Sequence, residues 1–143
     1  MPSKRTICFA ILLVLLAFVF SSCRKNVNPK EAMNYIAKGI AKHQLKDFQG
    51  AIKDYNMAIE MNPQSVEAYF FRGFAKQELA DKLGAIQDYT QAIKLNPQYA
   101  VAYLHRGITN LALGVQEAGC MDLREADALG EDRAKDILNK FCK

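Results

Sequence analysis

The sequence has very little of the material from which catalytic or metal sites are built. It contains only two histidines, His43 and His105, and neither has a cysteine or carboxylate at ligand spacing. No CxxC pair, phosphate-binding glycine loop or nucleophile elbow is present. These absences argue against a metal site, against a cofactor and against an enzyme.

Long runs of charge of one sign and low-complexity segments are also absent. The 19 lysines and arginines and 15 acidic residues are spread along the chain, and the formal net charge is only +4. A nucleic-acid-binding protein would concentrate basic residues on one surface. The charge pattern therefore predicts no nucleic-acid partner.

The chain has one long apolar run, residues 7–20, which follows Lys4 and Arg5. A helix over this run would span about 21 Å at 1.5 Å per residue, which is shorter than the roughly 30 Å hydrocarbon core. The pattern favours a secretory signal over a transmembrane helix.

A cysteine, Cys23, closely follows the apolar run, with Ser22 directly before it and the bulky Phe20 three residues before it. This arrangement resembles the bacterial lipobox, although Phe20 stands where leucine is usual. The resemblance implies that residues 1–22 are a cleaved signal peptide and that Cys23 carries a lipid, which would anchor the mature chain in a membrane. Because Arg24 follows Cys23 in place of aspartate, the expected location is the outer membrane, facing the periplasm. The alternative is an uncleaved or conventionally cleaved signal with a chance cysteine.

The rest of the chain repeats with a period of 34 residues. The positions in register are Pro29, Pro63 and Pro97; Tyr35, Tyr69 and Tyr103; Gly39, Gly73 and Gly107; Asp54, Asp88 and Asp122; and Ala58, Ala92 and Ala126. This many matches in one register indicate a repeat architecture.

The period and the residue pattern resemble the tetratricopeptide repeat (TPR), a pair of antiparallel helices. The third copy departs from the pattern, because Glu131 stands where proline is expected. The resemblance implies an all-α fold in which helix–turn–helix repeats stack as a short right-handed solenoid. The expected divisions after the signal peptide are a linker over 23–28, repeats within 29–130 (32–65, 66–99 and 100–133 in register) and a capping helix over 131–143.

Apolar periodicity predicts helices independently of the resemblance. Residues 30–43 and 48–60 carry apolar side chains at helical spacing. The residues after Gly130 also carry apolar side chains at helical spacing. This apolar stripe predicts a helix that caps the end of the stacked repeats. Arg72 and Arg106 recur in step with the repeat aspartates, so we expect structural arginine–aspartate pairs between helices.

In the TPR family the first helices line a concave face that usually binds peptides. Register places six apolar residues in this groove: Ile36, Ile40, Phe70, Phe74, Leu104 and Ile108. The Lys, Asn and Arg of the carboxylate clamp in chaperone-binding members are absent there. We expect Phe70 and Phe74, one helical turn apart, to be displaced from the core and to anchor a partner. Alternatively, packing, the lipidated N-terminal strand or self-association fills the groove.

Two cysteines, Cys120 and Cys142, remain in the mature chain once Cys8 is cleaved off and Cys23 is lipidated. They lie at nearly equal distances on either side of Gly130, so antiparallel helices would bring them level. An oxidising compartment favours a disulfide between them, and the alternative is two buried free thiols.

These observations together predict a non-catalytic adaptor without cofactors. It would be anchored by lipid and would hold a protein or peptide partner in an apolar groove. The alternative is a structural or assembly factor of a cell-envelope complex that acts by oligomerisation. An enzyme has no supporting constellation of residues.

Overall fold

The computed structural model describes residues 28–142, so the predictions for the signal peptide and for Cys23 lie outside the described residues. Within this part of the chain there are seven helices and no strand. The helices are α2 (Pro29–Gln44), α3 (Phe48–Met61), α4 (Val66–Glu78), α5 (Lys82–Leu95), α6 (Ala100–Ala112), α7 (Gln116–Ala128) and α8 (Asp132–Phe141).

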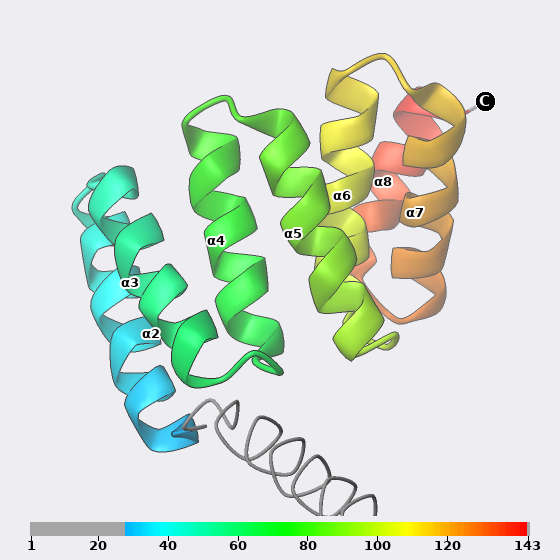
Figure 1. Ribbon diagram of the computed structural model, residues 1–143. Helices are drawn as coiled ribbons and strands as arrows, with labels where there is room; N and C mark the ends of the chain where they lie inside the picture. The colour runs from blue at the N-terminus through cyan, green and yellow to red at the C-terminus, as the bar shows by residue number, and fades with distance from the viewer. Residues whose placement is uncertain (1–27, 143) are drawn as a thin grey trace, which may run out of the picture.

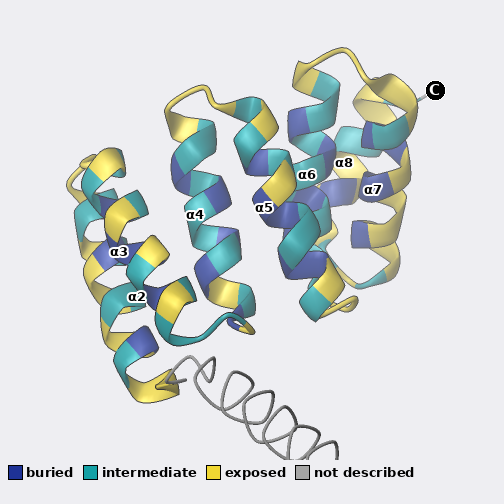
Figure 2. Cartoon of the chain, viewed as in Figure 1, coloured by how far each residue is buried: buried dark blue, intermediate teal, exposed yellow. Residues whose placement is uncertain are grey.

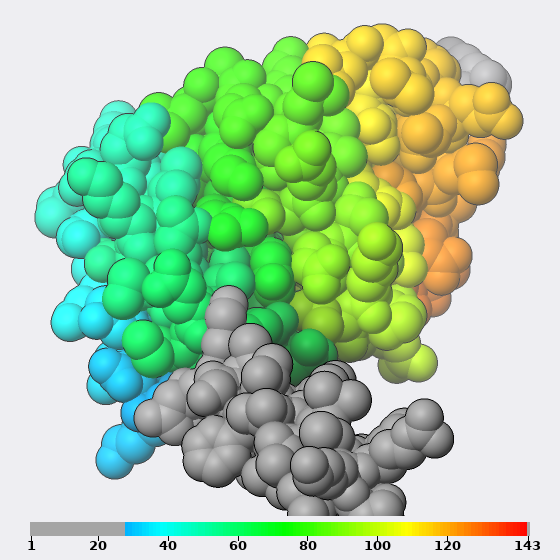
Figure 3. Space-filling view, in the orientation of Figure 1, coloured from blue at the N-terminus to red at the C-terminus, as the bar shows by residue number. Residues whose placement is uncertain are grey.

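The helices form three antiparallel pairs, α2–α3, α4–α5 and α6–α7, which stack side by side, with α8 beside α7 at the end (Figure 1). The stack is one continuous body in the space-filling view (Figure 3). The predicted all-α solenoid is therefore confirmed. The helices predicted over 30–43 and 48–60 each extend one residue further at one or both ends.

Side-chain caps begin the first four helices. Asn28, Asp47, Ser65 and Asp81 each accept a hydrogen bond from the backbone N–H three residues later. Such a cap satisfies one of the backbone donors left free in a helix's first turn. The last three helices, α6 to α8, have no side-chain cap.

The turn between the two helices of each repeat contains one residue in the left-handed region. The residue is Lys46 in the first repeat and Ala80 in the second, both with φ of 62°, and Gly114 in the third, with φ of 79°. Only glycine adopts this conformation without steric cost. The first two turns are therefore strained relative to the third.

Within each repeat, small residues let the two helices approach closely. A Cβ atom added to Gly73 would lie 2.9 Å from Cε1 of Tyr89, which is fully buried. Gly39 faces Tyr55 in the same way in the first repeat. Buried residues accordingly lie where the helices face one another (Figure 2).

Arginine–aspartate pairs join the helices, as predicted. Arg72 donates from Nε and Nη2 to the two carboxylate oxygens of Asp88, at 2.9 and 2.6 Å. Arg106 donates in the same way to Asp122, at 2.9 and 2.7 Å. In the first repeat Lys38 stands at the position of this arginine, and Asp54 pairs instead with Lys42, one helical turn later, at 2.6 Å.

Each arginine also reaches back to the preceding repeat. Arg72 donates from Nη1 to Oδ1 of Asn56 at 2.7 Å, and Arg106 donates from Nη1 to Oγ1 of Thr90 at 3.0 Å. Asn56 and Thr90 occupy the same position in successive repeats. The arginines thus connect neighbouring repeats as well as the two helices of their own repeat.

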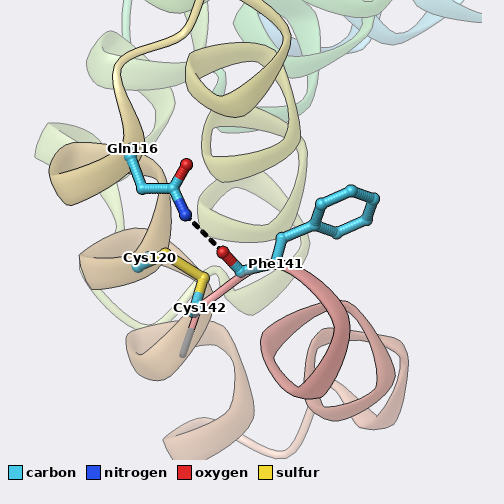
Figure 4. Close-up of a disulfide and its surroundings, with 4 residues drawn as sticks. All are labelled: Gln116, Cys120, Phe141 and Cys142. Atoms are coloured by element: carbon cyan, nitrogen blue, oxygen red, sulfur yellow. Dashed lines mark hydrogen bonds between the residues drawn. A yellow bond between two sulfur atoms is a disulfide. The ribbon is translucent and has the colours of Figure 1, made fainter.

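Helix α8 closes the C-terminal end of the stack. Its Ala134 is fully buried with Leu104, Leu123 and Ala126. A disulfide joins Cys120 of α7 to Cys142, the residue after α8, with their Cα atoms 5.6 Å apart (Figure 4). This is within the range that disulfide geometry requires.

Candidate protein-binding surface

The first helices of the three repeats, α2, α4 and α6, carry two apolar hollows. The N-terminal hollow lies between α2 and α4 and has a volume of about 390 Å³. It is lined by Pro29, Ala32, Met33, Ile36, Ala37, Ile40, Asn62, Ser65, Glu67 and Phe71. Glu67 is the only charged residue in this lining, so the hollow suits an apolar ligand.

The C-terminal hollow lies at the opposite end of the stack and has a volume of about 350 Å³. Its lining consists of Ile108, Leu111, Ala112, Gln116, Ile137 and Phe141. Two of these residues, Ile137 and Phe141, belong to α8. The cap therefore supplies one wall of this hollow.

The structure places four of the six predicted groove residues at or between the hollows. Ile36 and Ile40 line the N-terminal hollow, and Ile108 lines the C-terminal one. Phe74 is half-buried and lies in contact with His43 and His105.

The prediction that Phe70 is displaced from the core is wrong. Its side chain is only 7% exposed and packs in a core cluster with Tyr89, Ala92 and Ile93 of α5. Its ring also makes an edge contact with Tyr99, at a centroid distance of 5.4 Å. Because α5 and the start of α6 close over it, Phe70 is a core residue of the second repeat and cannot anchor a partner.

Leu104, also predicted to line the groove, is 1% exposed. It packs against Leu123 and Ala126 of α7 and Ala134 of the cap. The apolar groove predicted from the six residues is therefore interrupted at Phe70 and Leu104, and two separate hollows remain.

An aromatic cluster of His43, Phe74 and His105 lies on the first helices of all three repeats. The Phe74 ring stacks on His43 at a centroid distance of 4.9 Å and meets the edge of His105 at 5.1 Å. The Nδ1 atoms of both imidazoles are buried and have no hydrogen-bond partner among the described residues. We interpret the cluster as packing that connects successive first helices.

Burial keeps His105 neutral. Burial, reinforced by the nearby positive charge of Arg133 and partly opposed by the charge of Glu131, lowers the pKa of the His105 imidazole from 6.5 to about 4. Arg133, in the first turn of α8, is paired at 2.7 Å with Glu131, the residue directly before the helix. A neutral imidazole adds no charge to this part of the surface at pH 7.

A polar contact that the sequence did not reveal lies beside this cluster. Gln77 accepts hydrogen bonds from the Tyr89 hydroxyl at 2.9 Å and the Thr109 hydroxyl at 3.0 Å. Burial, reinforced by the charge of Asp88, raises the pKa of Tyr89 well above its ordinary value, so its hydroxyl stays a donor. In the sequence Gln77 is simply a polar residue three positions after Phe74, and nothing there indicates its two hydroxyl partners.

Neither a metal-binding cluster nor a membrane-spanning helix is found in the described part of the chain. No group of three or more histidine, cysteine, aspartate or glutamate side chains in residues 28–142 could hold a metal ion. No described helix is long and apolar enough to cross a membrane.

The family comparison agrees with the repeat register and the helix pairs. A family described as "TPR repeat" matches residues 39–79 and 84–114, which together make up half of the chain. The chain belongs to the TPR family. No curated protein matches it.

Several solved TPR structures resemble this TPR protein. The first TPR of Spaghetti (RPAP3) bound to the HSP90 peptide SRMEEVD has a TM-score of 0.79 at 24% identity, covering 81% of this chain and 94% of that one. The first TPR domain of human RPAP3 has a TM-score of 0.76 at 25% identity and covers 80% and 91%. The Arabidopsis OM64 TPR domain has a TM-score of 0.72 at 28% identity and covers 78% and 96%.

Proposed function

We propose that this TPR protein is a non-catalytic scaffold that holds an apolar segment of a partner protein in the N-terminal hollow. The observation that carries the proposal is the lining of this hollow, in which apolar side chains of α2 and α4 predominate and the exposed Glu67 is the one charged residue. TPR domains are protein-interaction modules, and a contiguous apolar surface that remains open is typical of a partner site.

The chemistry of the hollow argues against an acidic ligand. The peptide SRMEEVD, bound by the first TPR of Spaghetti (RPAP3), carries three carboxylate side chains. The N-terminal hollow of this chain has no lysine or arginine in its lining and one glutamate. An amphipathic helix or an extended apolar segment fits this lining better.

We further propose that a lipid on Cys23 tethers the scaffold to the outer membrane, facing the periplasm. The proposal rests on the sequence around Cys23, where the short apolar run ends in a lipobox-like pattern. Cys23→Ala should leave a longer, unprocessed precursor that takes up no radiolabelled palmitate. Unchanged mobility and unchanged membrane partition of this variant would contradict the tether.

Site-specific photocrosslinking tests the partner site. Met33 lines the N-terminal hollow and is 69% exposed, so a photoreactive amino acid there should leave the fold intact. Met121 of α7 is a control of similar exposure, since it is 61% exposed and lies outside both apolar hollows, in a separate depression whose lining includes the charged Arg106 and Asp122. We expect cells carrying the probe at position 33 to yield one discrete heterologous adduct that is missing with the probe at position 121.

Other adduct patterns would count against the scaffold. An adduct of twice the chain mass from position 33 would favour the alternative, a structural factor that acts by oligomerisation. Equal adducts from positions 33 and 121 would show that the hollow has no special role. Met33→Glu should abolish the specific adduct formed from a probe at Ala37, because it places a charge in the hollow.

A further inference from the structure

Non-covalent contacts hold the capping helix α8 only weakly. The helix has ten residues, fewer than the roughly 12 to 15 that an isolated helix needs to be even marginally stable. It has no side-chain N-cap, and Ala134 is its only buried residue. Ile137 and Leu138 are half-buried, and Phe141 is 47% exposed.

A covalent bond holds the far end of the cap. Cys142 directly follows the last helical residue, and its disulfide partner Cys120, 22 positions earlier in the sequence, is 5% exposed. Next to the disulfide, Gln116 of α7 donates a hydrogen bond from Nε2 to the carbonyl oxygen of Phe141 (Figure 4). The disulfide and this hydrogen bond therefore both fix the C-terminal end of α8, at Phe141 and Cys142.

The cap covers an apolar surface that would otherwise reach solvent. Leu104, Leu123 and Ala126 are buried together with Ala134. Ile137 and Phe141 also build one wall of the C-terminal hollow. Release of α8 would therefore expose the end of the stack and remove the hollow.

From the disulfide at the end of this weakly packed helix and the apolar surface beneath it, we propose that α8 is a redox-controlled lid. In the oxidised protein the lid is closed and the C-terminal hollow is complete. In the reduced protein the lid opens, while the three helix pairs stay folded. This inference does not depend on the lipid anchor or on the identity of a partner.

The redox step is thiol–disulfide exchange with a dithiol reductant. One thiolate of the reductant attacks the Sγ atom of Cys142, the more exposed of the two cysteines, and the Cys120 sulfur leaves as a thiolate. The second thiol of the reductant then attacks the mixed disulfide and releases Cys142. The reductant becomes a disulfide, and the protein gains two electrons and two protons.

Hydrogen exchange on the full mature chain, with and without dithiothreitol, tests the lid. The chain-entropy model for a loop of about this length predicts that loss of the disulfide favours the open lid roughly 300-fold. We therefore expect α8 amides to exchange about 300-fold faster in the reduced protein, and α2 to α5 amides to change less than about twofold. Binding of an apolar fluorescent dye should rise at the same time.

Two variants serve as controls. Cys142→Ser should reproduce the reduced behaviour of the wild type and should not respond to dithiothreitol. Lys140→Ser, an exposed change in the same helix, should keep the response of the wild type. Equal protection of α8 in the oxidised and reduced proteins would overturn the proposal. So would a loss of protection in all helices together, since the disulfide would then stabilise the whole fold instead of a lid.

Discussion

Replacing Phe70 by alanine should destabilise the fold severely, whereas replacing Phe74 should not. Phe70 is 7% exposed, and its ring lies 5.3 Å from that of Phe71 and 5.8 Å from that of Tyr89. Truncation of a buried phenylalanine leaves a cavity and costs about 3 to 5 kcal/mol. Phe74 is half-buried and loses mainly its contacts with the two imidazoles and its stacking on the Phe70 ring, so its truncation should cost about 1 to 2 kcal/mol.

Urea unfolding followed by circular dichroism measures both effects. A domain of this size has a total stability of about 5 to 15 kcal/mol, so Phe70→Ala should remove a large share of it. Its midpoint should fall far more than that of Phe74→Ala, with little change in the slope of the transition. A loss below about 1 kcal/mol for Phe70→Ala would refute the core assignment and restore Phe70 as a candidate groove residue.

Three further predictions concern the turns, the helix contacts and pH. Ala80→Gly should stabilise the protein by about 1 kcal/mol in urea unfolding, because φ at this position is 62°; a loss of stability would contradict the strain. Gly73→Ala should lower the free energy of unfolding by about 1 to 3 kcal/mol, because its Cβ atom would press on the buried Tyr89 ring, and an unchanged midpoint would mean that the helices can separate freely. The pKa of His105 is about 4 in the folded protein and 6.5 when unperturbed, so the unfolded chain binds the proton more readily and stability should fall as pH drops from about 6.5 to about 4. His105→Gln should flatten that pH dependence, and equal slopes for variant and wild type would refute the burial of a neutral imidazole.

The fold could be predicted from the sequence because several independent signals share one register. The 34-residue period fixes the length of each unit, and polar residues such as Asp47 and Ser65 mark helix starts. The ends of the helices predicted over 30–43 and 48–60 therefore agree with the structure to within one residue, whereas the capping helix, expected over 131–143, runs over Asp132–Phe141. The fold tolerates the missing proline at Glu131, because α8 begins after a turn that contains Gly130, with φ of 88°.

The groove could be predicted only in part, because equivalent positions face different neighbours. Ile36, Phe70 and Leu104 share one register, yet only Ile36 remains half-exposed. Beside Ile36 the core is built from alanines, which leave room for a hollow, whereas Phe70 meets the large rings of Tyr89 and Tyr99. A helical period specifies the direction of a side chain, but its burial depends on the volume of residues distant in sequence.

The arginines that reach back to the preceding repeat give the array a direction and make it extendable. Arg72 uses Asn56 as its acceptor, and Arg106 uses Thr90 at the same position one unit later. A second copy of residues 66–99, inserted after residue 99, would place a new arginine opposite Thr90 and a new threonine opposite Arg106. The arginine hydrogen bond between neighbouring repeats would thus be reproduced without any other substitution. The number of units, and with it the length of the concave surface, can be varied separately from the sequence of either end.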